Sequence, residues 1–241
     1  MNISCKADIL KEFDRRRISA IIRTDDQQLA ADAMNAAVAG GFRIVEFTLT
    51  TPGALELIAE FARAPEELLV GAGTVMTSQQ AEGAVQAGAR FLVSPVCDPE
   101  IIACAQRLDV VCIPGTFTAT EMITAHRAGA DLLKLFPAPA DVAQYVKSIL
   151  GPLPYLKIFP TAGVDIENMR EVLDAGAAGI GFVRSLFAPA DMTARNFDAI
   201  QQRASAITAR MRSLRECHPR DDHQDFATSA KRPSHRPHAS M

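Results

Sequence analysis

The chain is poor in features that mark whole classes of protein. Among its 241 residues there is no tryptophan, aromatic residues make up 6%, and the formal net charge is −3. A nucleic-acid or anionic-membrane surface needs a basic field, and proteins that bind single strands also stack bases on aromatic rings. The composition therefore predicts that nucleic acid is not a partner.

Signals for a membrane or for secretion are also missing. No apolar run approaches the roughly 18 residues that a membrane-spanning helix needs. The charged start, MNISCKADILKEFDRRR, lacks the apolar core of a secretory signal. The cysteines have no CxxC pair and no regular spacing, which is typical of reduced thiols. We therefore expect a cytoplasmic protein without membrane contact. The cysteines are Cys5, Cys97, Cys104, Cys112 and Cys217.

Short apolar runs alternate with Ala-rich helical patterns as far as about residue 215. The runs are rich in β-branched residues and most end at Gly or Pro, which is typical of buried strands. Several of the helical patterns end in Gly, as expected of a helix C-terminus. The expected strands are residues 18–23, 42–49, 68–75, 91–96, 110–115, 131–137, 156–163 and 179–185.

Eight strands separated by helical crossovers predict an α/β fold, a (β/α)8 TIM barrel over residues 1–215. An open doubly wound sheet is the alternative, because the number of strands does not by itself close a barrel. A helix at residues 5–16 precedes the first strand and is expected to cover the barrel floor. The polar remainder, residues 216–241, has too few apolar residues to offset the cost of ordering, so we expect a disordered tail.

In a TIM barrel the reactive groups lie at the C-terminal ends of the strands. Applied to the expected strands, this rule gives a list of candidate site residues. They are Arg23, Glu46 with Thr48 and Thr50, Thr74, Pro95, Lys134 with Phe136, Thr161 with Gly163, and Arg184 with Ser185.

Metal and cofactor chemistry find no support in the pattern. His126 is the only histidine before the tail, and no HxH or ExxH cluster is present, so no metal site is predicted. The G-x-x-G-x-G pattern at residues 176–181 enters a strand, whereas a dinucleotide fingerprint leaves one. No G-x-S-x-G elbow appears, which argues against a serine hydrolase. We therefore expect no cofactor.

Alternation along the strands decides which candidates point inward. On the second strand Glu46 shares a face with Ile44 and Thr48, opposite a purely apolar face that should pack against helices. On the sixth, DLLKLFP, Lys134 shares a face with Leu132 and Phe136. Both Glu46 and Lys134 are therefore expected inside the barrel.

A buried lysine has a depressed pKa, because desolvation disfavours the ammonium form. A neutral amine can attack a carbonyl carbon and form a Schiff base, and the protonated Schiff base is an electron sink for carbon–carbon cleavage. Glu46, with its pKa raised by the same surroundings, could move the protons that this reaction requires. The structural alternative is a buried Glu46–Lys134 ion pair that only fixes geometry.

The other strand ends have two interpretations each. Arg23 could hold a substrate carboxylate bidentately, or its stem could simply pack at a strand end. Thr74, in GAGTV, either offers a hydroxyl to a ligand or belongs to a plain turn. Phe136 could line a carbonyl pocket or be part of the core.

With these residues placed, the chain closely resembles the class I 2-keto-3-deoxy-6-phosphogluconate (KDPG) and 4-hydroxy-2-oxoglutarate (KHG) aldolases. The resemblance runs from about Ile18 to Phe187. It rests on VEFTLTTPGA, LLVGAGTV, FLVSPV, IPGTFTATE, LLKLFPAP and FPTAGV. It implies a (β/α)8 barrel, a homotrimer, and a lyase that splits a 2-keto-4-hydroxy acid into pyruvate and an aldehyde.

The resemblance also implies roles for individual residues. Lys134 would form the Schiff base and Glu46 would be the general acid/base. Arg23 and Thr74 would hold the pyruvyl end beside Pro95 and Phe136. The loop of Thr161, Ala162 and Gly163 would bind the distal phosphate through backbone N–H groups.

Two departures from the family pattern concern the substrate. Thr50 stands where some members have an arginine, which places more of the carboxylate binding on Arg23. Val183 and Arg184 replace a typical Gly-Ser pair. Losing the glycine removes room for a phosphate, while Arg184 adds a charge that could hold a phosphate or a carboxylate.

Two other functions remain open from the residues alone. One is a barrel isomerase or synthase that uses Glu46 as base and Lys134 only as an electrostatic clamp. The other is a non-catalytic barrel that binds sugar acids.

Overall fold

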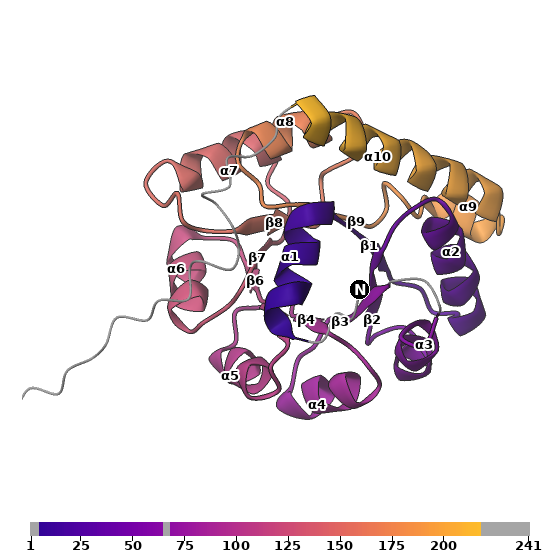
Figure 1. Ribbon diagram of the computed structural model, residues 1–241, viewed down its shortest axis with the longest axis horizontal. Helices are drawn as coiled ribbons and strands as arrows, with labels where there is room; N and C mark the ends of the chain where they lie inside the picture. Colours follow the sequence, from indigo (N-terminus) through magenta and orange to yellow (C-terminus); the bar gives the residue numbers. More distant parts are fainter. Residues whose placement is uncertain (1–4, 65–67, 218–241) are drawn as a thin grey trace, which may run out of the picture.

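The computed structural model describes residues 5–64 and 68–217, which form parallel strands surrounded by helices. Figure 1 shows the helices as a ring around the strands. The strands are β1 (Ile18–Ile22), β2 (Ile44–Thr48), β3 (Leu69–Gly73), β4 (Phe91–Val93), β5 (Val111–Ile113), β6 (Gly115–Thr116), β7 (Leu133–Leu135), β8 (Ile158–Pro160) and β9 (Ile180–Phe182). All but β6 lie wholly inside runs that the sequence predicts as strands.

The predicted TIM barrel is confirmed, and its fifth strand is split. Hydrogen bonds order the strands as β5-β4-β3-β2-β1-β9 in one sheet and β6-β7-β8 in another. Pro114, which has no N–H to donate, separates β5 from β6. The two sheets meet on both sides: Lys134 N–H donates to the Pro114 carbonyl at 2.9 Å, and Ala178 N–H to the Ile158 carbonyl at 2.8 Å.

Five of the ten helices described begin where the sequence supplies a capping side chain. Asp26, Thr77, Asp98, Thr118 and Asp141 each accept a hydrogen bond from a backbone N–H of the first turn. The helices are α1 (Lys6–Arg16), α2 (Gln27–Ala39), α3 (Ala54–Phe61), α4 (Ser78–Gln86), α5 (Pro99–Arg107), α6 (Ala119–Arg127), α7 (Val142–Leu150), α8 (Met169–Asp174), α9 (Pro189–Thr193) and α10 (Phe197–Cys217).

The lower half of the barrel interior is a closed apolar core that α1 covers, as predicted. In Figure 1 this helix lies across one end of the ring of strands. Phe13 of α1 is buried and packs edge-to-face on Phe91 at 5.1 Å and on Phe159 at 5.8 Å between ring centroids. Burying such a ring contributes roughly 1.5–3 kcal/mol. Because the floor is sealed, ligands reach the interior from the opposite, C-terminal end of the strands.

The long helix α10 closes the outer layer against α2. Thr208 Oγ1 donates to the Gly40 carbonyl at 2.8 Å, and Ala204 packs where a side chain at position 40 would lie. The predicted tail, residues 216–241, lies outside the described residues except for its first two positions, which belong to α10. Among the helices described, none combines the length and the apolar character that crossing a bilayer requires.

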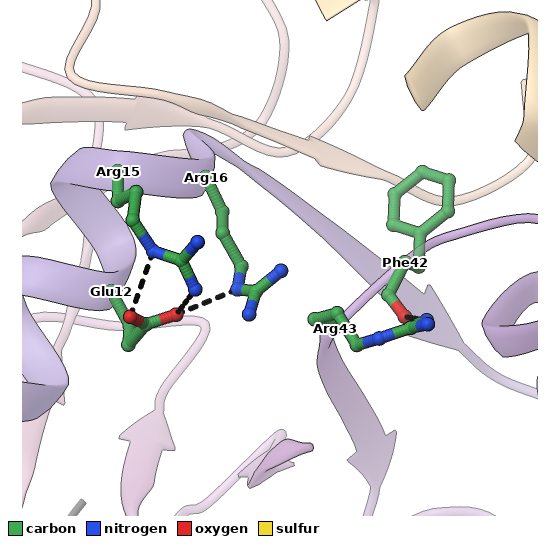
Figure 2. A network of polar contacts seen from close by, with 5 residues as sticks. All are labelled: Glu12, Arg15, Arg16, Phe42 and Arg43. Atoms are coloured by element: carbon green, nitrogen blue, oxygen red, sulfur yellow. Dashed lines mark hydrogen bonds and ion pairs between the residues drawn. The ribbon is translucent and has the colours of Figure 1, made fainter. Parts of the chain in front are cut away.

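Glu12 ties together the last turn of α1. Its carboxylate accepts hydrogen bonds from Arg15 Nε at 2.9 Å, from Arg15 Nη2 at 2.6 Å and from Arg16 Nε at 2.7 Å (Figure 2). Burial alone would raise the pKa of Glu12, but the hydrogen bonds and charges of the two arginines outweigh it and lower that pKa. Arg43, which Figure 2 shows nearby, donates to the Val38 and Phe42 carbonyls instead.

We expect Glu12→Gln to destabilise the fold by about 2 kcal/mol at pH 7, or about 4–8 °C in Tm, because two arginines lose a charged acceptor. The lowered pKa means that this stabilisation is present above the unfolded pKa of about 4.3 and is lost as pH falls through the folded value. Thermal unfolding at pH 7 and pH 3.5 measures both effects. Glu82→Gln, at an exposed position in α4, is the matched control. Equal Tm changes for the two variants would contradict the prediction.

Candidate active site

Glu46 and Lys134 both point into the upper half of the barrel, as the alternation predicts. Glu46 is 2% exposed and Lys134 6%, although each carries an ionisable group. Ile44 and Leu132, two residues earlier on the same faces of their strands, belong to the apolar floor. Glu46 and Lys134 are the next inward-facing residues toward the open end of the barrel. The two side chains therefore lie directly above the apolar core.

Desolvation dominates the ionisation of both groups. Burial raises the pKa of Glu46, and the positive charges of Lys134 and Arg23 only partly oppose this effect. Burial likewise lowers the pKa of Lys134; the charge of Glu46 opposes the shift and that of Arg23 adds to it. The site thus favours a neutral amine and a carboxyl group that titrates closer to neutral pH.

The buried ion pair that the sequence left as an alternative is not formed. Among the described residues, no ion pair within 4.0 Å joins Glu46 to Lys134, and Glu46 Oε1 is a buried atom without a hydrogen-bond partner. An unpaired buried carboxylate oxygen costs about 1–3 kcal/mol or more. A fold keeps such an atom more readily where a bound molecule supplies the missing partner.

Arg23 lies at the C-terminal end of β1, and its contact with Thr74 joins two predicted site residues. Arg23 Nη2 donates to Thr74 Oγ1 at 3.0 Å across β2. Thr74 has φ of 58°, a left-handed conformation that a β-branched residue rarely adopts. Thr74 therefore does lie in a turn, and in that turn its hydroxyl accepts a hydrogen bond from the guanidinium.

Threonine hydroxyls fix the strand end beside Arg23. Thr48 Oγ1 lies 3.1 Å from Thr50 Oγ1 and 3.3 Å from Thr51 Oγ1. Thr51 Oγ1 also accepts the backbone N–H of Thr24 at 3.3 Å, which holds the residue next to Arg23. Sequence reasoning missed Thr51, because it follows the strand and alternation says nothing about loops.

Phe136 and Pro95 form the rim of the site on the side of β4 and β7. The Phe136 ring lies 5.1 Å from Lys134 Nζ and is 40% exposed, so it is not a core residue. Pro95 and Phe136 line one side of an open pocket that extends over Gly115 and Phe117. The interpretation of Phe136 as simple core packing is therefore wrong.

The predicted distal loop follows β8. Thr161 is 4% exposed and its Oγ1 is buried without a hydrogen-bond partner, like Glu46 Oε1. Ala162 is half-buried, and Gly163 is exposed with φ of 70°, a conformation that glycine allows. The two unpartnered oxygens are both on inward-facing side chains of the upper barrel.

Arg184 lies outside the interior of the barrel. Its side chain is exposed at the end of β9, and no contact with another site residue is formed in the described part of the chain. The next residue is anchored: Ser185 Oγ donates to the Val164 carbonyl at 2.7 Å. Arg184 therefore stands beside the loop of residues 161–163, outside the Glu46–Lys134 centre.

Comparison with known proteins decides the family. A family model described as KDPG and KHG aldolase matches residues 9–203. The chain belongs to the KDPG and KHG aldolase family. The 2-dehydro-3-deoxy-6-phosphogalactonate aldolase of Escherichia coli K12 is 34% identical over 201 residues, which cover 82% of this chain and 94% of that protein.

Solved structures agree with this assignment. A KDPG aldolase from Legionella pneumophila, solved with pyruvate captured as a covalent carbinolamine, has a TM-score of 0.72 and 28% identity, covering 81% of this chain and 95% of its own. A cube-shaped cage designed by fusing symmetric oligomeric domains has a TM-score of 0.73 and 30% identity, covering 83% and 74%. As a member of this family, the chain described here is a class I aldolase, a carbon–carbon lyase.

Proposed function

We propose that Lys134 forms the Schiff base and that Glu46 is the general acid/base in the cleavage of a 2-keto-3-deoxy sugar acid. The observation that carries this proposal is the pair of buried, unpaired ionisable groups inside the barrel, with the pKa of the amine lowered and that of the carboxyl raised. The lowered pKa favours the neutral amine that attacks a carbonyl, and the raised pKa lets the carboxyl group hold a proton more readily.

The reaction begins at the keto carbon. Neutral Lys134 Nζ attacks C2, Glu46 delivers a proton to the carbinolamine oxygen, and water leaves to give a protonated Schiff base. The Glu46 carboxylate then takes the proton of the C4 hydroxyl. The C3–C4 bond breaks, its electron pair enters the Schiff base as an enamine, and the aldehyde departs. Protonation at C3 and hydrolysis by water release pyruvate and free Lys134.

The carboxylate of the substrate would be held by Arg23. Its guanidinium is already oriented by Thr74, and Thr24 N–H is fixed by Thr51. A donor that is already oriented loses little entropy when a ligand binds, so this arrangement strengthens the binding of a 2-keto acid. Phe136 and Pro95 would close the apolar side of the pyruvyl pocket.

The distal end of the substrate would reach the loop of Thr161, Ala162 and Gly163 and the exposed guanidinium of Arg184. A permanent positive charge beside a glycine loop suits a phosphate. We therefore propose a 6-phosphorylated 2-keto-3-deoxy acid as the preferred substrate, with glyceraldehyde 3-phosphate as the aldehyde. A 4-hydroxy-2-oxoglutarate would present only a carboxylate at C5, which is nearer to the reacting carbons than a phosphate on C6.

An assay of pyruvate release coupled to lactate dehydrogenase tests the proposal. It should be run on phosphorylated and unphosphorylated 2-keto-3-deoxy acids of both C4 configurations and on 4-hydroxy-2-oxoglutarate. We expect the highest kcat/KM on a phosphorylated acid. Tight binding without pyruvate release, across the whole panel, would instead identify a sugar-acid-binding barrel.

Arg184→Ser should lower kcat/KM for the phosphorylated acid about 10- to 100-fold, because one charge-assisted contact to phosphate is lost. For the unphosphorylated acid the change should be small, since that substrate has no charge at the distal end. Steady-state kinetics on the two substrates measure the ratio. Equal losses on both would show that Arg184 does not contact the distal group.

We also propose that the aldolase is a cytoplasmic homotrimer. The designed cage built from symmetric oligomeric domains supports an oligomer of this fold. The unpaired cysteines among the described residues fit a reducing compartment. Sedimentation equilibrium on the full chain gives the oligomeric state, and a monomeric mass at micromolar concentration would contradict it.

A further inference from the structure

Strand β3 carries two inward-facing glycines, Gly71 and Gly73, in the stretch GAG. Neither is needed for backbone freedom, because neither has a positive φ. Glycine inside a strand weakens it and often marks a close approach by another group. The space above each glycine therefore shows what the missing side chain allows.

The two glycines accommodate different neighbours. Above Gly71 lies the ring of Phe91, which belongs to the apolar floor. Above Gly73 the three nearest heavy atoms all come from Glu46. An ideal Cβ at position 73 would lie 2.8 Å from Glu46 Cδ and 3.0 Å from Glu46 Cγ, and nearer still to Oε1. Real Cβ atoms essentially never approach a heavy atom this closely.

We propose that Gly73 is a positioning residue for the reaction, because its missing side chain forms the socket that holds the Glu46 carboxylate. This inference rests on the proposed role of Glu46 as acid/base. The carboxyl group runs from β2 over the neighbouring strand, so position 73 decides where its oxygens lie relative to Lys134. Thr48 is paired with Gly73 across the strands, so Glu46 reaches past its own partner, Gly71, toward the open end.

The space above Gly73 also holds the unpartnered Oε1 of Glu46. Oε1 occupies the space that a side chain at position 73 would fill, and it forms no hydrogen bond there. A side chain that is positioned by space rather than by a donor keeps its lone pairs available for the substrate hydroxyl. Any larger residue at position 73 would displace the reacting oxygen before it displaced the backbone.

Gly73→Ala tests the inference with little expected damage to the fold, because only the flexible end of Glu46 is in the way. We expect kcat to fall about 100-fold, as for a misplacement of the acid/base by about 1 Å. KM should stay within about threefold, since Arg23 and Thr74 are untouched. Gly83→Ala is the matched control in α4: its added Cβ would meet only Leu55 Cδ1, at 3.9 Å, and wild-type kinetics are expected.

A double-mutant cycle separates this role from a general structural one. In a Glu46→Gln background, Gly73→Ala should cost almost nothing further, because both changes act on the same carboxylate. A kcat for Gly73→Ala within twofold of wild type would overturn the inference. So would an equal loss in both backgrounds.

Two further readouts cover the remaining outcomes. If Gly73→Ala does not fold, the double variant Glu46→Ala with Gly73→Ala should, because the clash is then absent; failure of both to fold would overturn the inference. Pyruvate and borohydride should label Lys134 in both wild type and Gly73→Ala. An unlabelled wild-type protein would refute the proposed function itself, independently of position 73.

Discussion

Lys134→Arg is expected to abolish aldol cleavage, with kcat reduced by about 10⁴-fold or more, because arginine keeps the positive charge and cannot form a Schiff base. This substitution separates two chemistries. An electrostatic clamp would tolerate arginine, so an isomerase or synthase that uses Lys134 only as a charge should retain measurable turnover. Coupled pyruvate release measures the rate.

Covalent trapping gives the same answer without turnover. Wild-type protein incubated with pyruvate and borohydride should gain one reduced pyruvyl group on the peptide that contains Lys134, and the arginine variant should gain none. A labelled peptide elsewhere in the chain, or an unlabelled wild type beside a labelled reference class I aldolase, would contradict the assignment.

Lys134→Met provides the folding control. Burial lowers the pKa of Lys134, so the folded state binds this proton less well than the unfolded state does, and stability falls as pH decreases below the unfolded pKa of about 10.4. Removing the amine should therefore leave Tm at pH 7 unchanged or higher. An inactive variant with undiminished Tm would show that the lysine is retained for chemistry at some cost in stability.

Glu46→Gln is expected to reduce kcat about 10²- to 10⁴-fold, the usual contribution of a general acid/base. The amide keeps the shape of the carboxyl group in its socket above Gly73 but cannot accept the C4 hydroxyl proton. Borohydride trapping with pyruvate should still label Lys134, more slowly, because the nucleophile is intact. A variant with wild-type kcat would remove Glu46 from the mechanism.

The pH dependence of kcat should report the same group. Cleavage needs the Glu46 carboxylate, whose pKa is raised by burial, so kcat should rise with pH through a value above the ordinary 4.3 or so of a glutamic acid. In Glu46→Gln this ionisation should disappear from the kcat profile. Its persistence would assign the ionisation to another group.

Much of the fold follows from local patterns. Period-two alternation is fixed by the extended backbone. The stretches VEFT and LLKLF therefore predict which side chains face inward without knowledge of the neighbouring strands. The same holds for the capping residues that begin α2, α4 and α6, and for the apolar face of α1. The break between β5 and β6 is also readable at Pro114, although we predicted one continuous strand there.

The site was predictable only in part. Glu46, Lys134 and Arg23 lie where strand ends in a barrel must lie, so the sequence placed them in one chamber. That Lys134 and Glu46 form no ion pair, that Phe136 is exposed, and that Arg184 lies outside the centre depend on side-chain directions that alternation does not give.

The sequence by itself determined the alternation of strands and helices, the helix α1 before the first strand and the inward direction of the reactive amine and carboxyl group, because these depend on periodicities within single elements. Only the tertiary structure decided which residues meet across strands. The pairing of Thr48 with Gly73 brings the Glu46 carboxylate over a glycine, and the turn at Thr74 aims its hydroxyl at Arg23. Register arises from packing among many elements, so no single stretch of the chain encodes it.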